Sequence, residues 1–559
     1  GELGDAVALL VDRTVAARGG QTPAPAELPY LERIAHRLGG LPLALELAAA
    51  RLRVLAAHQL AERLDVELAG GSADLLGTLD AGRGRGRGRH ATLEDTVEWS
   101  YRTLDERAAR LLRWLSVYAI PVDLATAEWL VDGDPLPALT TLVDKSLLHA
   151  EPVVTGATYR MLDPIRSYAA RALVAAGEER TARDRHVSWL LHAMERARLG
   201  PDGRAGTLSL YPLDRFADEV RAALRWCVTG GSVRPALRLI RGMEQWWRER
   251  GLAREGRLWL FRLYGRIAET GEEVPPAELA AAYHVHSLHA GADGEFAEQL
   301  RFSQRAEAAA HQAGDDGLLA RVLAGRGPSL LDLGRDAEAE QACREVIEWA
   351  TQRGVVADAL YAIFCLAQLL WRRGAYDEAA ELLGSARQAE AARPDVRGRR
   401  SVDLLLGMVA LARGDLVAGH DHVTVALRSR MEHGFHGRAC EALNAMAVRC
   451  AMGDDPTTAA RLFGAAAANR ARLRCHPGHF ADYWREQQKA VRAALGDERF
   501  DAAYADGTRL SLADAVALAL AVEHPDLSSG QAEEHLLHRV TLPAARKPRP
   551  VLEPDRGTA

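Results

Sequence analysis

The chain has 559 residues, of which 48% are apolar and 6% aromatic, and a formal net charge of −6 at pH 7. Alanine and leucine dominate the apolar set, which favours helices over strands, and the negative charge argues against a DNA-coating surface. Six scattered cysteines without a Cys-x-x-Cys pair indicate small buried residues in a reducing cytosol. The best apolar run, residues 512–522, contains Asp514 and is too short to span a bilayer. We therefore expect a mostly α, soluble, cytoplasmic protein.

A joint between two predicted helices stands near the N-terminus. Apolar residues recur at helical spacing over residues 26–38, and Gly39-Gly40 end this helix. Pro42 then occupies the first turn of a second helix, where its missing N–H has no cost. The spacing alone indicates a packed helical joint.

The joint belongs to the longer string Arg37-Leu38-Gly39-Gly40-Leu41-Pro42-Leu43-Ala44-Leu45-Glu46, and further strings follow it. They are Glu98-Trp99-Ser100-Tyr101, Leu142-Val143-Asp144-Lys145-Ser146-Leu147 and Tyr159-Arg160-Met161-Leu162-Asp163-Pro164. Up to about Leu520, their order resembles the C-terminal portion of NB-ARC or STAND-type signalling NTPases with tetratricopeptide repeats. The likeness is greatest to actinobacterial AfsR and large LuxR-type transcriptional regulators. It implies that residues 1–75 form the helical lid of the NTPase and that Pro42 lies against the adenine of ATP or ADP.

The phosphate-binding half of such a nucleotide site is not found in the sequence. A P-loop needs Gly-x-x-x-x-Gly-Lys-Ser/Thr, and none of the three lysines, Lys145, Lys489 and Lys547, follows a glycine loop. No apolar strand ends in an acidic pair that could hold magnesium. We therefore expect no enzyme activity from this chain alone, and ATP or ADP binding only in a longer protein. Because the resemblance is already under way at Gly1, we expect either a fragment or a protein that has lost its ATPase core.

Residues 76–90 form a predicted linker rich in glycine and arginine. Gly82 to Arg89 alternate between the two residue types, a composition that prevents packing and stays solvated. An Arg-Gly tract that binds nucleic acid is the alternative. The linker is favoured because no aromatic residue interleaves the arginines.

Residues 91–180 have the pattern of a winged-helix domain, and the resembling family places one here. We expect helices near residues 93–101, 104–117, 124–130 and 136–143, then strands at 146–149 and 158–162 around Gly156. The candidate recognition stretch, residues 136–145, carries one cation and one acid, whereas a DNA reader needs several donors. We therefore favour a role within the protein, with DNA binding by the winged helix as the alternative.

The string Met161-Leu162-Asp163 stands where the resembling family carries Met-His-Asp, whose histidine senses the diphosphate of ADP. Leu162 cannot donate such a hydrogen bond. Asp163 retains the carboxylate and also suits the N-cap of a helix that follows. Pro42 and Asp163 are therefore the two candidate nucleotide-binding residues.

The C-terminal half contains an internal repeat. Turns recur at Gly294, Gly334, Gly374, Gly414 and Gly453, with spacings of about 40 residues and Ala-rich helices on both sides. Residues 276–522 therefore predict a solenoid of tetratricopeptide-like helix pairs, with residues 181–275 as a helical bridge into it. The long period matches the repeats of maltose-regulator type that the resembling NTPases carry as sensor arms. Such an array presents a surface for a protein, peptide or small-molecule effector.

The remaining candidate sites are weak. Trp246, Trp247 and Trp259 are expected in the core more than on a binding face. His284, His286 and His289 do not converge on a helix, and the cluster at residues 475–479 has no partner for a metal site. Residues 523–559 are proline-rich and predicted to be disordered, where many members of the resembling family carry a DNA-binding helix-turn-helix.

Taken together, these features predict the sensor and switch portion of an ATP/ADP-regulated transcriptional regulator. An effector would bind the repeats, DNA would be bound only through the full-length regulator, and oligomerisation would accompany activation. No membrane partner, metal or catalytic residue is expected. The alternatives are a free-standing tetratricopeptide-type interaction scaffold and a winged-helix DNA-binding protein.

Overall fold

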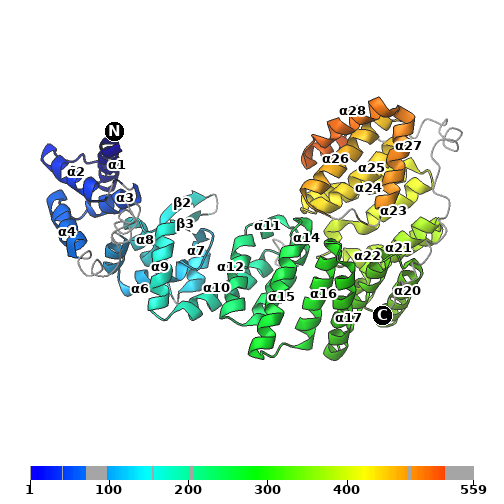
Figure 1. The fold of residues 1–559 in the computed structure, drawn as a ribbon, viewed down its shortest axis with the longest axis horizontal. Helices are drawn as coiled ribbons and strands as arrows, with labels where there is room; N and C mark the ends of the chain where they lie inside the picture. The colour runs from blue at the N-terminus through cyan, green and yellow to red at the C-terminus, as the bar shows by residue number, and fades with distance from the viewer. Residues whose placement is uncertain are drawn as a thin grey trace, which may run out of the picture. The chain divides into compact units, whose positions relative to one another are not determined.

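The computed structural model describes residues 2–38, 40, 42–70, 97–131, 133–153, 156–199, 206–475, 478 and 480–522. The predicted linker at 76–90 and the predicted tail at 523–559 lie outside these residues. The described chain is mostly α, with one three-stranded sheet (Figure 1). It divides into two compact units. Unit 1 comprises Gly1–His192 and Asp218–Gly231, and unit 2 comprises Ala193–Ala217 and Ser232–Ala559. Residues of the predicted bridge therefore belong to both units.

The elements up to residue 229 are α1 (Glu2–Ala17), η1 (Pro25–Glu27), α2 (Leu28–Arg37), α3 (Pro42–Arg51), α4 (Ala57–Gly70), α6 (Glu106–Leu115), β1 (Val122–Asp123), α7 (Leu124–Leu130), α8 (Leu136–Asp144), β2 (His149–Val153), β3 (Gly156–Arg160), α9 (Asp163–Ala175), α10 (Glu179–Arg196), α11 (Tyr211–Asp214) and α12 (Ala217–Thr229). Residues 97–102 are also helical.

The later elements are α13 (Val233–Gly242), α14 (Glu244–Glu249), α15 (Ala253–Thr270), α16 (Pro276–Ala292), α17 (Phe296–Ala313), α18 (Asp316–Leu323), α19 (Arg326–Asp332), α20 (Asp336–Gln352), η2 (Val356–Asp358), α21 (Leu360–Arg373), α22 (Tyr376–Ala391), η3 (Arg397–Arg399), α23 (Ser401–Ala412), α24 (Leu416–Glu432), α25 (His436–Met452), α26 (Pro456–Arg472), α27 (Ala481–Leu495), α28 (Asp497–Thr508) and α29 (Leu512–Leu520).

The predicted N-terminal joint is confirmed in its helices. Helix α2 ends at Arg37, Gly40 has the left-handed φ of 68° that favours glycine, and α3 begins at Pro42. Helices α1 to α4 share one apolar core, to which Leu10 and Ile34 contribute fully buried side chains. The joint therefore orients four short amphipathic helices around a common centre.

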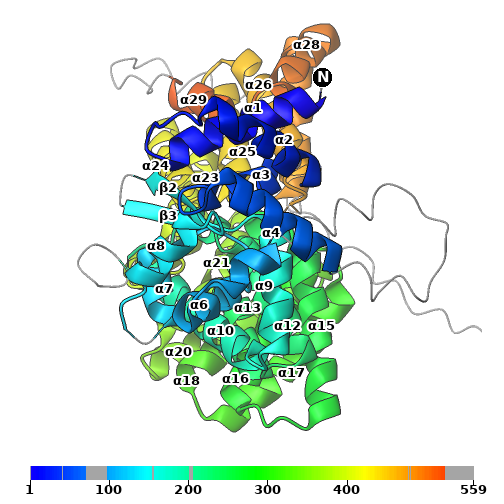
Figure 2. The same cartoon turned by 90° about the vertical axis from the view of Figure 1, so that its left-hand side faces the viewer.

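The winged-helix prediction is confirmed by the order α6, β1, α7, α8, β2, β3 along the chain. Figure 2 shows α6, α7, α8, β2 and β3 grouped together. The strands pair antiparallel in the order β1-β3-β2, with Val122 opposite Tyr159 and His149 opposite Arg160. Asp105 and Asp123 cap α6 and α7 by accepting hydrogen bonds from backbone N–H groups.

Two details of the sheet differ from the sequence expectation. The strand expected at 146–149 begins only at His149, because Ser146 has a left-handed φ of 56° and turns the chain. Strand β1, which has only two residues, was not predicted, since so short a segment carries no period. Gly156 starts β3 with φ of 141°, in agreement with the expected hairpin.

Unit 2 contains the predicted stack of helix pairs. In α16–α17, α21–α22, α23–α24 and α25–α26, each helix packs against the next, and the first helices α19, α21, α23 and α25 also contact one another in sequence. One continuous apolar core runs from Ala320 to Ala519.

The turns of the array follow the predicted glycines with one exception. Gly294, Gly334, Gly374 and Gly414 have φ between 74° and 83°, which ends each helix without steric strain. At the fifth turn the left-handed residue is Asp454, with φ of 67°, and not Gly453. An aspartate tolerates this conformation better than most residues, which permits the shift.

Candidate functional site

A cleft of about 410 Å³ lies between the N-terminal helices and the winged helix within unit 1. It is lined by Arg13, Ala17, Glu46, Ala49, Ala50, Arg53, Asp144, Ser146 and His149. Arg13 Nε lies 3.3 Å from Glu46 Oε1, and Arg53 Nη2 donates to Asp144 Oδ2 at 3.2 Å. Both arginines of the cleft are thus paired with acids that also line it. The Arg53–Asp144 pair joins the N-terminal helices to the winged helix.

The two candidate nucleotide residues lie outside the lining of this cleft. Pro42 is exposed at the first position of α3. Asp163 is in the first turn of α9, with its side chain 98% exposed and 4.0 Å from Arg166 Nε. The prediction that Asp163 caps this helix is wrong, because the extended residue before the helix is Leu162. The structure therefore does not bring Pro42 and Asp163 together in one described pocket.

An adenine nucleotide needs an apolar face for its base and hydrogen-bond donors for its phosphates. The exposed ring of Pro42 offers a rigid apolar face, but phosphates need unpaired donors or a glycine loop. In the cleft, the guanidinium groups of Arg13 and Arg53 are committed to Glu46 and Asp144. No phosphate-binding step can be assigned to the described part of unit 1.

The outer face of α8 is poor in groups that could read DNA. Leu136 is 48% exposed at its start, and Pro137 and Thr140 are also exposed. At its end, Lys145 Nζ donates to Thr103 Oγ1 at 2.9 Å, and burial, with nearby Arg51 and Arg53, lowers the pKa of Lys145. The two charged residues of the stretch, Asp144 and Lys145, thus make contacts inside unit 1.

The charged side chains of the β2–β3 wing are also paired with each other. Arg160 Nε donates to Glu151 Oε1 at 2.7 Å across the two strands. Residues 154 and 155 at the tip lie outside the described part of the chain. Within the described wing, therefore, the arginine that could contact a phosphate already has a carboxylate partner.

A second cavity, of about 230 Å³, lies inside unit 2 and was not predicted. The residues that enclose it come from α14, α16, α17, α19, α21, α23, α24 and α25 and from the segment after α26. The layer of first helices therefore forms much of its wall.

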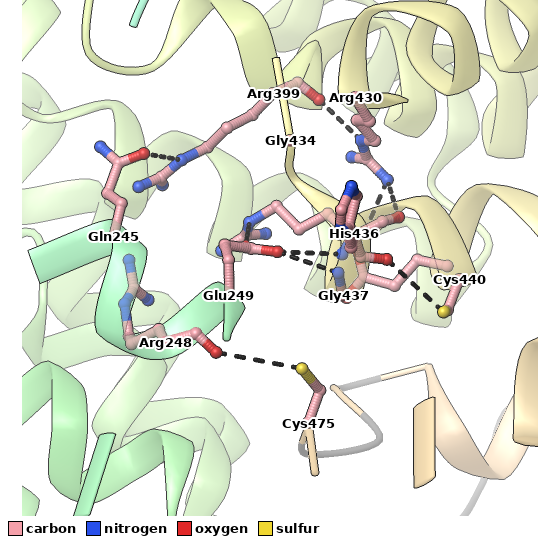
Figure 3. Close-up of polar contacts among 12 residues, drawn as sticks. Gln245, Arg248, Glu249, Arg399, Arg430, Gly434, His436, Gly437, Cys440 and Cys475 are labelled. Carbon is pink, nitrogen blue, oxygen red and sulfur yellow. Dashed lines mark hydrogen bonds and ion pairs between the residues drawn. The ribbon is translucent and has the colours of Figure 1, made fainter. Parts of the chain in front are cut away.

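Charged side chains gather at one end of this cavity. Arg248 Nε lies 2.6 Å from Glu244 Oε1, and Arg438 Nε lies 3.3 Å from Glu249 Oε1. Glu249 also accepts from the backbone N–H of Gly437 at 3.0 Å, as Figure 3 shows. The first pair lies within α14, whereas the contacts of Glu249 connect α14 to α25, nearly 200 residues later in the sequence.

Arg430 stands at the centre of the cluster. Its side chain is 1% exposed, and its guanidinium donates to the carbonyl oxygens of Arg399 at 2.7 Å and Arg438 at 2.6 Å (Figure 3). The carboxylate oxygen Glu441 Oε2 lies 3.6 Å from Arg430 Nη1. Burial lowers the pKa of Arg430 to about 10.

Tyr361 connects the cluster to α21. Its hydroxyl accepts hydrogen bonds from Arg248 at 3.1 Å and from Arg399. Burial by itself would raise the pKa of this hydroxyl, but Arg399 and Arg248 outweigh it and lower the pKa to about 8. Because the oxygen accepts from both arginines, its own O–H can donate to a ligand.

The other sequence candidates have structural roles. Trp246, Trp247 and Trp259 are buried, which confirms the expectation of core packing. Five cysteines are buried, and Cys475 is half-buried with Sγ 3.9 Å from the carbonyl oxygen of Arg248 (Figure 3). Within the described ranges, no three His, Cys, Asp or Glu side chains are placed to hold a metal ion. Residues 476, 477 and 479 of the second metal candidate lie outside those ranges.

His289 gives a testable dependence of stability on pH. Burial lowers its pKa to about 4 from the ordinary 6.5, so the unfolded chain is protonated first as pH falls. The resulting loss of stability falls between about pH 6.5 and pH 4. When the pH is lowered from 7 to 5, the unfolding free energy of unit 2 should fall by about 2 kcal/mol less in a His289→Gln variant than in the parent. Urea titration followed through the exchange protection of α16 amides measures this difference for unit 2. Equal losses in both proteins would contradict a neutral buried His289.

Comparison with known proteins gives one domain match and several distant relatives. Residues 104–174 match the family model described as a winged helix-turn-helix domain. Proteins of Mycobacterium tuberculosis and Mycobacterium bovis, provisionally named HTH-type transcriptional regulators, are 29% identical over 381 residues. The match covers 66% of this chain and 41% of each relative, so the chain spans less than half their length. An uncharacterized protein of M. tuberculosis is 31% identical over 206 residues, which cover 36% of this chain and 50% of that protein.

One solved structure is a distant match. It is the signal transduction ATPase with numerous domains (STAND) protein with a tetratricopeptide repeat sensor from Pyrococcus horikoshii. The match has 14% identity and a TM-score of 0.28, over 88% of this chain and 74% of that chain. A TM-score of this size does not establish a common arrangement.

In the described part of the present chain, each helix is too short or too polar to pass through a lipid bilayer.

Proposed function

We propose that this chain is the sensor and switch portion of a transcriptional regulator. The carrying observation is that a winged helix, matched over residues 104–174, precedes a helical repeat array with an enclosed charged cavity. The relatives named as transcriptional regulators support the same role. The repeats receive an effector, which is a protein or a small molecule.

The proposed switch uses ATP and ADP only in a longer protein. In it, the lid helices and the winged helix contact a nucleotide-binding core of the NB-ARC or STAND kind, as in AfsR and large LuxR-type regulators. Effector binding releases that contact and permits exchange of ADP for ATP and oligomerisation. DNA is then bound by another domain of the full-length regulator. The phosphate-binding groups would have to come from that core, because Arg13 and Arg53 in the cleft of unit 1 are paired with Glu46 and Asp144.

A winged-helix DNA-binding protein is the second candidate, and the domain match favours it. Two observations argue for an internal role of the winged helix. The start of α8 is apolar and exposed, and Asp144 and Lys145 contact Arg53 and Thr103 within unit 1. A free-standing interaction scaffold is the third candidate.

The coding sequence upstream of Gly1 separates these candidates. An in-frame phosphate-binding loop followed by an apolar strand with acidic residues is the expected result. An initiation codon directly before Gly1 would contradict the regulator and favour the scaffold.

Pro42 should affect nucleotide affinity in the longer protein. If its ring lies against adenine, Pro42→Ala should weaken ADP binding by about 1 kcal/mol, the scale of one ring contact. Isothermal titration calorimetry measures this difference. Pro212→Ala, a substitution at the start of α11 in unit 2, is the control and should leave ADP affinity unchanged. Equal ADP affinity in the Pro42→Ala variant and the parent would leave Pro42 with a structural role only.

A further inference from the structure

The cavity of unit 2 is lined by different kinds of side chain near Tyr361 and near Gln368. Tyr361, Phe364, Cys365 and Gln368 all line it. These residues follow one another at helical spacing on α21, so they form a stripe along one face. Tyr361 and Gln368 are seven residues apart, which places their positions about 10 Å apart along the helix axis.

The Tyr361 end is rich in donors. Arg248, Arg430 and Arg438 line the cavity there, and Tyr361 joins Arg248 to Arg399. Three of these arginines, Arg248, Arg430 and Arg438, pair with Glu244, Glu441 and Glu249 at 2.6 Å to 3.6 Å. Asp395 and Glu390 also interact electrostatically with Arg399 and Arg430. The charges of the cluster are therefore largely compensated, and the donor that faces a ligand is the O–H of Tyr361.

At the Gln368 end, the lining groups are hydrogen-bond acceptors, which need a donor. Asp332 lines the cavity and accepts a hydrogen bond from the Gln299 side chain, while burial raises the pKa of Asp332 to about 7. Since Gln299 donates its N–H to Asp332, its amide oxygen faces elsewhere. That oxygen, Gln299 Oε1, and the buried Gln368 Oε1 have no hydrogen-bond donor in the described structure. Buried acceptors without donors are unfavourable, so this end suits a ligand that donates.

Apolar side chains also line the cavity. Phe364 stands between Tyr361 and Gln368 on α21, and Leu404 and Leu405 of α23 are further lining residues. Its volume of about 230 Å³ is below the range of about 300–1,000 Å³ for drug-sized ligand sites. The cavity thus fits a small metabolite better than a peptide.

We infer that this cavity binds a small ω-amino acid or a close analogue. Its carboxylate lies against Tyr361 and Arg430, its methylene chain against Phe364 and the leucines, and its ammonium group against Asp332, Gln299 and Gln368. The inference rests on the proposed sensor role of the repeats, and it names the chemical class of the effector.

Calorimetry on the full chain with a series of probes tests the inference. The probes are unbranched ω-amino acids from 4-aminobutanoate to 8-aminooctanoate, with hexanoate and hexylamine as single-ended controls. We expect saturable binding with one preferred chain length, and at least tenfold weaker binding of either single-ended compound. No saturable binding, or affinities that do not vary with length, would overturn the inference.

Substitutions at the two ends locate the ligand. Tyr361→Phe should weaken the preferred probe about tenfold, the scale of one hydrogen bond to a charged group. Asp332→Asn should weaken the ω-amino acid but not hexanoate. Arg344→Gln, in an exposed ion pair with Glu340 on α20, is the control and should bind as the parent does. Circular dichroism melts of each variant check that the fold is retained.

The result is independent of the test of the proposed function. Probe binding with an initiation codon directly before Gly1 would retain the site and reject the regulator. A phosphate-binding loop upstream without probe binding would retain the regulator and reject this ligand class.

Discussion

Replacing Glu219 with alanine is expected to lower the unfolding free energy of unit 1 by about 3 to 5 kcal/mol. The Glu219 side chain is fully buried. Its Oε1 accepts from the backbone N–H groups of Ala119 at 2.7 Å and Ile120 at 2.8 Å, and its Oε2 lies 2.6 Å from His186 Nε2. Removing the carboxylate leaves the buried His186 ring and two partly buried backbone N–H groups without this partner.

Local hydrogen exchange of the Ala119 and Ile120 amides measures the effect, because a chain with two units need not unfold in one step. Both amides should exchange far faster in Glu219→Ala than in the parent. Asp218→Ala is the matched control, since the neighbouring carboxylate is 72% exposed and lies 3.0 Å from Arg221 Nη1. Its effect should stay below about 1 kcal/mol. Similar protection in both variants would contradict a supporting role for the buried carboxylate.

Gly507→Val should destabilise unit 2 by about 3 kcal/mol or more. Helices α26 and α28 touch at their backbones, so a Cβ atom at Gly507 would lie 1.9 Å from the carbonyl oxygen of Arg461. The contact is reciprocal, because a Cβ at Gly464 would lie 2.2 Å from the carbonyl oxygen of Tyr504. The helices must separate to admit any side chain, and the core between them opens.

The control is Gly384→Ala, which should raise the stability of unit 2 rather than lower it. Gly384 is in α22, and a Cβ atom there would meet nothing within 4 Å. Alanine is the better helix former, so this variant should gain about 0.5–1 kcal/mol. Native-state hydrogen exchange of amides in α22 and α26, in the two variants and the parent, gives both values for unit 2 alone. Equal stability of Gly507→Val and the parent would contradict the close packing of α26 on α28.

The repeats and the winged helix could be predicted because their signals are local. Glycine turns at a 40-residue period mark the helix ends directly, and the shift to Asp454 shows how little the turn depends on the glycine itself. The strand boundary near Ser146 could not be placed, since a single left-handed residue leaves no periodic trace.

The charged cavity could not be predicted for a different reason. Glu249, Tyr361 and Arg438 come from three helices that are far apart in the sequence, and each residue alone resembles an ordinary surface or core position. Only the superhelical packing of the array brings them together. Pro42 and Asp163 came from a family resemblance, and their nucleotide roles remain predictions.

We propose that the winged helix acts inside a regulator and does not itself read DNA. Selection from a random-sequence duplex pool with the whole chain, at physiological salt, is the decisive experiment. Scattered arginines give only contacts to phosphates, so binding should be weak, unselective and lost as salt rises. We therefore expect no enriched sequence. Recovery of one sequence that binds at least a hundredfold more tightly than the pool, and retains this preference at higher salt, would contradict the account.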